Sequence, residues 1–90
     1  MEKIELKVST KSNPNSVAGA IAEFIKENDV INIKTIGAGA LNQGMKAIAI
    51  ARGFIVPQGI DIVCVPSFYR TEIDGDEISA IMLTIKKVQA

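Results

Sequence analysis

The segment from Ile33 to Gly53 contains a strand end, a glycine-rich turn and a helix. Its sequence is Ile-Lys-Thr-Ile-Gly-Ala-Gly-Ala-Leu-Asn-Gln-Gly-Met-Lys-Ala-Ile-Ala-Ile-Ala-Arg-Gly. Gly37 and Gly39 form the turn, and the helix expected from about Ala40 to Arg52 is mostly apolar. A helix with so little polar surface must be covered on most sides. Its unpaired N-terminal N–H groups and positive dipole end also favour an anion at the turn.

Two nucleotide-binding loop motifs are excluded at this turn. Asn42 stands where a dinucleotide-binding loop has its third glycine. The segment Gly39–Gly44 has the glycine spacing of a P-loop, but Met45 replaces the lysine and Ala47 the hydroxyl residue that hold phosphates and Mg²⁺. Two interpretations of the turn remain, tight packing between strand and helix or direct contact with a phosphate.

Periodic apolar residues predict the elements before the turn. Residues 4–8 alternate between apolar and charged side chains, which is typical of a half-buried strand. Asn13-Pro14 begins a helix, because Asn caps N–H groups and Pro fits the first helical position. Apolar residues recur at helical spacing over 17–25, and residues 30–36 form a second strand.

The elements after the turn are a helix end and two strands. Gly53 is expected to end the second helix. The strand expected over Ile60–Tyr69 lacks a polar face, which predicts cover on both sides, and Pro66 marks an edge or a bulge. Asp74-Gly75 is a hairpin turn signal, and a last strand follows from Glu77 to about Lys87.

The order βαβαββ predicts an α/β fold. Right-handed crossovers place both helices on one face of a four-stranded mixed sheet, giving a two-layer sandwich. Residues 1–90 are too few for more than one such domain. Gly44, Ala47 and Ala51 form a smooth stripe on the second helix. That stripe allows close approach of another backbone, either the domain's own sheet or a second subunit.

The composition excludes several function classes. Without histidine and with Cys64 as its one cysteine, the chain has no His-based catalytic triad, intrachain disulfide or cysteine-rich metal site, so we expect no enzyme, metal or cofactor. Cys64 lies in an apolar run and is interpreted as a buried small hydrophobe. No segment is long enough to span a bilayer, which predicts a soluble, cytoplasmic protein without membrane contact.

The charges favour local rather than general binding to nucleic acid. Ten basic and ten acidic residues cancel, and the aromatic content is only 4%. The hairpin tip is acidic, with Arg70 as its one offsetting cation. Lys11 precedes the first helix and Lys46 lies on the second, so the two cations either converge on one edge or are scattered, solubilising charges.

Several blocks of the sequence resemble the stage V sporulation protein S family. They are Lys7-Val-Ser, Pro14-Asn-Ser-Val-Ala-Gly-Ala, Ile36-Gly-Ala-Gly-Ala-Leu-Asn-Gln, Lys46-Ala, Ala49-Ile-Ala-Arg-Gly-Phe, Ile73-Asp-Gly and Ala80-Ile. The resemblance covers essentially the whole chain, and Gly44, where family members carry Ala, is one departure. The family is associated with spore development and septation control in bacteria, and is not known as enzymatic.

The resemblance also implies a fold and a binding surface. The family is similar in fold to Alba-type chromatin proteins, which are βαβαββ dimers that bind DNA or RNA. Carried over, the resemblance points to Lys11 in the first loop, Asn42 and Lys46 on the second helix, and Arg70 on the hairpin. The Alba hairpin is basic, whereas this one is acidic, which argues against insertion of the hairpin into a groove.

Two hypotheses follow. The first is a non-enzymatic, nucleic-acid-binding regulator of sporulation or septation, acting as a homodimer or higher oligomer. Its contact residues would be Lys11, Asn13, Gly37, Gly39, Asn42, Lys46 and Arg70. The alternative is a protein-interaction module that uses the Gly44 stripe or the third strand without touching nucleic acid. An enzyme or a receptor for a small-molecule substrate has little support.

Overall fold

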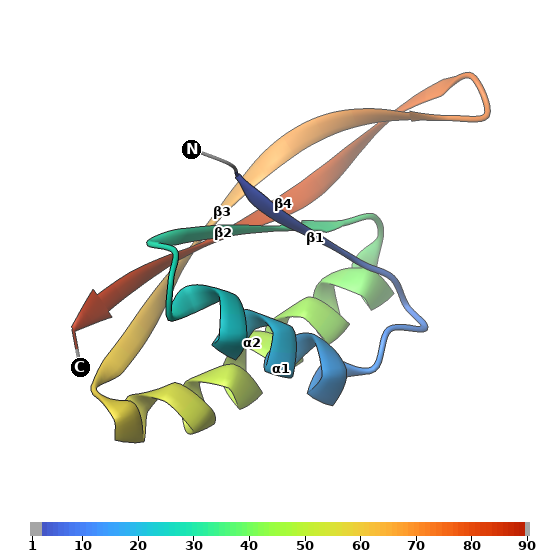
Figure 1. Ribbon diagram of the computed structural model, residues 1–90. Coiled ribbons are helices and arrows are strands. Elements are labelled where there is room, and N and C mark those ends of the chain that lie inside the picture. The colour runs from blue at the N-terminus through green and yellow to red at the C-terminus, as the bar shows by residue number, and fades with distance from the viewer. Residues whose placement is uncertain (1–2, 90) are drawn as a thin grey trace.

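The computed structural model describes residues 3–89 as a sheet covered by two helices (Figure 1). The strands are β1 (Ile4–Val8), β2 (Val30–Thr35), β3 (Ile60–Ile73) and β4 (Asp76–Gln89). The helices are α1 (Pro14–Ile25) and α2 (Ala38–Ile55), and a short 3₁₀ turn, η1 (Val56–Gln58), follows α2. Both helices lie on the same face of the sheet, as predicted, and among residues 3–89 no second layer covers the other face (Figure 1).

The sheet has the strand order β1-β2-β4-β3. β1 pairs with β2 in parallel, while β4 pairs with β2 and β3 in antiparallel fashion. The β4 residues that pair with β2 end at Ile81, and the hairpin continues beyond them as a projecting arm, residues 69–80. Asp74 and Gly75 both have positive φ angles at its tip, of 52° and 82°. The predicted hairpin turn is therefore confirmed, and the last strand is slightly longer than expected.

The core lies between α1, α2 and the covered face of the sheet. Ile31 and Ile33 of β2 and Ile85 of β4 are completely buried there. A Cβ atom added to Gly44 would lie 3.3 Å from Leu83 Cδ1 and 3.4 Å from Thr35 Cγ2. The smooth stripe of α2 thus packs on the domain's own sheet, and the interpretation of that stripe as a docking surface is wrong.

The end of the second helix differs from the prediction. α2 begins at Ala38 and continues through Gly53 to Ile55, and Gly59, with φ 85°, ends the following 3₁₀ turn. Gly53 is exposed, whereas Ile55 is completely buried. Continuing the helix for three more residues therefore adds a large apolar side chain to the core, which offsets the low helix propensity of glycine.

Within residues 3–89, the cover predicted for both faces of the third strand is present on one face alone. Ile62 is buried beneath the helices, but Val63 and Val65, on the other face, remain 48% and 45% exposed. Phe68, at the base of the arm, is 80% exposed. The reason is that the described part of the chain supplies a single helical layer. Pro66 lies in β3, which is an edge strand as its missing N–H group predicts.

Candidate nucleic-acid interface

The β1–α1 loop and the first turn of α2 contact each other at one end of the domain. A Cβ atom added to Gly39 would lie only 2.8 Å from Thr10 Oγ1, so glycine is what allows this approach. Gln43 Nε2 also donates a hydrogen bond of 2.9 Å to the Ser12 carbonyl oxygen. These two contacts place the backbone of the exposed Lys11 close to the glycine turn. That Lys11 and Lys46 converge on one edge stays a prediction.

Gly37 and Asn13 occupy the N-terminal positions of the two helices. Gly37 is the N-cap of α2, with φ 90° and ψ 160°, and no side chain caps this helix. Asn13 is the N-cap of α1, and its Oδ1 accepts from Asn15 N at 2.8 Å and Ser16 N at 3.3 Å. The first N–H groups of α2 therefore have no side-chain cap, whereas the Asn13 oxygen is already used in capping.

Asn42, Lys46 and Arg70 lie further from this contact. Asn42 and Lys46 are exposed on α2, one turn apart, and Lys46 is seven residues or about 10 Å along the helix from Gly39. Arg70 lies on the arm, where its guanidinium group is ion-paired with Glu77. The structure thus brings Lys11, Gly37 and Gly39 together, continues their edge along α2, and leaves Arg70 apart on the arm.

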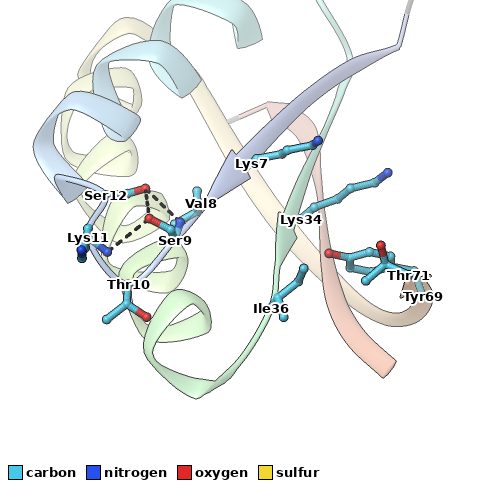
Figure 2. Close-up of a pocket in the computed structure, with 10 residues that line it drawn as sticks. All are labelled: Lys7, Val8, Ser9, Thr10, Lys11, Ser12, Lys34, Ile36, Tyr69 and Thr71. Atoms are coloured by element: carbon cyan, nitrogen blue, oxygen red, sulfur yellow. Dashed lines mark hydrogen bonds between the residues drawn. The ribbon is translucent and has the colours of Figure 1, made fainter. Parts of the chain in front are cut away.

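A hollow of about 550 Å³ opens between the β1–α1 loop and the base of the arm (Figure 2). It is lined by residues 7–12, Lys34, Ile36, Tyr69 and Thr71. In Figure 2, Lys7 and Lys34 extend in the same direction, and Tyr69 and Thr71 lie beside Lys34, across the hollow from the loop. The structure therefore adds a second basic site, which we call the basic hollow, to the edge predicted from the sequence.

Two of the three lysines of the basic hollow come from the uncovered face of the sheet, and the third, Lys11, comes from the β1–α1 loop. Lys7 of β1 pairs in register with Lys34 of β2. Lys34 Nζ also lies 3.4 Å from Glu5 Oε2 and 5.4 Å from the centroid of the Tyr69 ring. The alternation in residues 4–8 and 30–36 already placed Lys7 and Lys34 on polar faces, but neither was among the predicted site residues. The position of Tyr69 depends on the β3–β4 register.

An ion pair links the other end of α2 to β3. Arg52 Nε and Nη2 donate to the two carboxylate oxygens of Asp61 at 2.7 and 2.9 Å, and the Ile62 N–H group donates to the same carboxylate at 2.7 Å. The hydrogen bond from Arg52 and then that from Ile62 lower the pKa of Asp61 below its ordinary value. This pair lies near the C-terminal end of α2, away from the glycine turn.

We expect Asp61→Asn to destabilise the protein at neutral pH and to have progressively less effect in acid. Because the folded-state pKa of Asp61 is lowered, the ionised carboxylate stabilises the fold above its ordinary pKa. That contribution is lost as the pH falls through the lowered value. Urea unfolding midpoints of the unmodified protein and of Asp61→Asn should differ at neutral pH, and this difference should shrink as the pH is lowered. Glu72→Gln, on the exposed arm, is the control, and a pH-independent loss for Asp61→Asn would contradict the assignment.

Other chemistry is sparse in the part of the chain that the structure describes. Cys64 is partly buried against the core, and desolvation raises the pKa of its thiol, which agrees with the predicted hydrophobic role. Among the described residues, no group of three acidic or cysteine side chains could hold a metal ion. Between residues 3 and 89, neither helix has the length and apolarity needed to cross a membrane.

This arrangement of sheet, paired helices and projecting hairpin defines an Alba-like fold. The chain is similar to Alba from Thermoplasma volcanium, with a TM-score of 0.64 and 14% identity over 92% of this chain and 96% of that one. At this identity the likeness establishes the fold alone. The family model described as Stage V sporulation protein S (SpoVS) matches residues 4–88, and the chain belongs to that family. The protein is therefore connected with sporulation.

Proposed function

We propose that this protein is a non-enzymatic regulator of sporulation or septation that binds DNA or RNA through the edge formed by the β1–α1 loop and α2. The observation that carries the proposal is the contact between Thr10 and Gly39, which places Lys11 beside the uncapped N-terminus of α2. Phosphates would meet Lys11, the N–H groups of the turn after Gly37, and Lys46. Asn42 lies one turn before Lys46 and would hydrogen-bond to a phosphate or sugar.

The distribution of charge supports an edge rather than the whole surface as the binding site. The chain has no net charge, so its long-range attraction to a polyanion is weak. The acidic residues of the arm tip would repel phosphates, and Arg70 is already paired with Glu77. Contacts at the loop and along α2 therefore account best for binding, and the arm would point away from the nucleic acid.

Self-association is part of the proposal. Val63 and Val65 on the uncovered sheet face, and Phe68 on the other side of β3, leave apolar surface exposed along this strand. A homodimer or larger oligomer that covers β3 would hide this surface and place two basic edges on one particle. The same exposed surface supports the second candidate function, a protein-interaction module located in the cytoplasm that acts without nucleic acid.

Charge reversal at the basic edge tests the proposed function. We expect Lys11→Glu combined with Lys46→Glu to abolish binding to both DNA and RNA at low salt. In the unmodified protein, log affinity should fall linearly with log salt, with a slope of roughly 0.7–0.9 per phosphate contact. Fluorescence anisotropy with labelled single- and double-stranded oligonucleotides would measure both quantities.

A matched control separates the effect of the basic edge from the effect of the change in net charge. Lys26→Glu combined with Lys86→Glu makes the same change in charge at exposed positions near Val30, at the opposite end of β2 from the loop. This control should retain most of the affinity. Absence of binding by the unmodified protein at low salt, or equal losses for the two double variants, would contradict the proposal and favour the protein-interaction module.

A further inference from the structure

The basic hollow has the chemistry of a site for a small phosphorylated ligand. Its lining includes three lysines and five hydroxyl-bearing side chains, and no carboxylate. Its volume of about 550 Å³ falls within the range of roughly 300–1,000 Å³ that is typical of small-molecule sites. Ammonium groups bind phosphate, while hydroxyl groups both donate to and accept from the hydroxyls of a sugar.

The register of β1 and β2 gives an independent reason to expect an anion here. Lys7 and Lys34 are direct neighbours on the same sheet face, and like charges at neighbouring positions of a sheet repel each other. Glu5 lies 3.4 Å from Lys34 and offsets part of that repulsion. One carboxylate beside two ammonium groups still leaves excess positive charge, which a phosphate between Lys7 and Lys34 would neutralise.

Tyr69 supplies the aromatic surface that a bare phosphate site would not need. It is the one tyrosine of the chain, and its half-buried side chain lies across the hollow from the β1–α1 loop (Figure 2). The Lys34 ammonium group is 5.4 Å from the centroid of its ring. Because this ammonium group lies over the ring, a planar base that stacks on the same face would displace it. The flexible lysine side chain could then pair with the phosphate of the ligand.

We propose that the basic hollow binds a single nucleotide, with its phosphate on Lys7 and Lys34, its sugar against the hydroxyls of Ser9 and Thr71, and its base against Tyr69. The nucleotide would be either a free mononucleotide or the unpaired end of a bound strand. The second source rests on the proposed function, because it requires nucleic acid on the adjacent edge. The first source needs no strand on that edge, although Lys11 belongs to both the edge and the hollow.

The first experiment follows the ring protons of Tyr69 by NMR during titration with adenosine 5′-monophosphate. Because the chain has one tyrosine, these signals report directly on the hollow. We expect them to shift with adenosine 5′-monophosphate, and to shift much less with adenosine, ribose 5-phosphate or inorganic phosphate at the same concentration. Equal responses to inorganic phosphate and to the nucleotide would overturn the proposal in favour of a simple anion site.

Variants separate the hollow from the basic edge. Tyr69→Leu and Lys34→Gln should each weaken nucleotide binding about tenfold, which is of the order expected for loss of one aromatic or charged contact. Tyr69→Phe should bind nearly normally, because it keeps the ring. Chemical-shift changes of backbone amides measure binding where the ring is absent, and unfolded variants would be recognised in the same spectra.

Lys46→Gln, on the exposed face of α2, is the control for the proposed function. It should bind the mononucleotide normally and bind long strands more weakly. If nucleotide binding fails while Lys46→Gln still weakens strand binding, the hollow proposal is wrong and the proposed function stands. If the nucleotide binds and no strand does, the hollow proposal stands and the proposed function is wrong. A strand with an unpaired end that binds no better than one with blunt ends would exclude the strand as the source.

Discussion

Replacing Gly37 by alanine should destabilise the protein by about 1–3 kcal/mol, the cost of holding an ordinary residue in a backbone region that glycine alone adopts easily. Gly37 has φ 90° and ψ 160°. No atom outside its chain neighbours lies within 4 Å of an added Cβ, so the cost arises in the backbone and not from a clash. Urea unfolding followed by circular dichroism would measure the change.

Gly53→Ala is a matched control that makes the same chemical change with the opposite expected sign. Gly53 is an exposed position inside α2, and an added Cβ would meet nothing within 4 Å. Alanine should stabilise this position by about 0.5–1 kcal/mol, because glycine is the poorer helix former. Destabilisation by Gly53→Ala would mean that α2 ends at this glycine after all. A neutral effect of Gly37→Ala would contradict the positive φ at the turn.

The same Gly37 substitution has a functional consequence. The turn sets where the N-terminus of α2 meets the β1–α1 loop. Thr10 lies so close to Gly39 that a Cβ atom would not fit between them. A shift of the turn would separate Lys11 from the N–H groups of α2. We therefore expect weaker nucleic-acid binding by Gly37→Ala even where it is fully folded, whereas Gly53→Ala should bind normally.

Local patterns in the sequence predicted most of the fold, because each pattern depends on near neighbours. Alternation defined β1 and β2, and Asn13-Pro14 marked the start of α1. The end of α2 was mispredicted because a glycine signal competed with burial of Ile55, which depends on tertiary packing. Cover on both faces of β3 was mispredicted because an apolar strand does not show whether its cover lies within the same chain.

The candidate site also has a part that the sequence could predict and a part that it could not. The loop and the glycine turn follow the ends of two neighbouring parallel strands, so topology alone places Lys11 near Gly37. The basic hollow needs more information, because Tyr69 is distant in sequence from Lys7 and Lys34. Its place beside Lys34 follows from the length and register of β3 and β4. Sequence patterns indicate that a hairpin exists, but not which of its residues lies beside a lysine two strands away.

Replacing Ile33 by alanine should have the largest effect on stability, a loss of about 2–5 kcal/mol. Ile33 is completely buried, pairs in register with Leu6 and Leu83, and has a methyl group 3.8 Å from the position of a Cβ on Gly44. The cavity would therefore open beneath the close contact that Gly44 of α2 makes with the sheet. Small domains have total stabilities of roughly 5–15 kcal/mol, so much of the stability would be lost.

Val63→Ala is the companion variant, since it shortens an apolar side chain on the uncovered face of the same sheet. Val63 is 48% exposed, and in a monomer its truncation should change stability by no more than about 0.5 kcal/mol. If a second copy covers β3, the Val63→Ala loss should be larger and should grow with protein concentration, because folding is then coupled to association. Urea midpoints of both variants at low and high concentration, with light scattering for size, would separate these cases.

A small loss for Ile33→Ala would contradict the packing of α2 on the sheet. A concentration-independent effect of Val63→Ala within that small range would leave the β3 face open for a different partner.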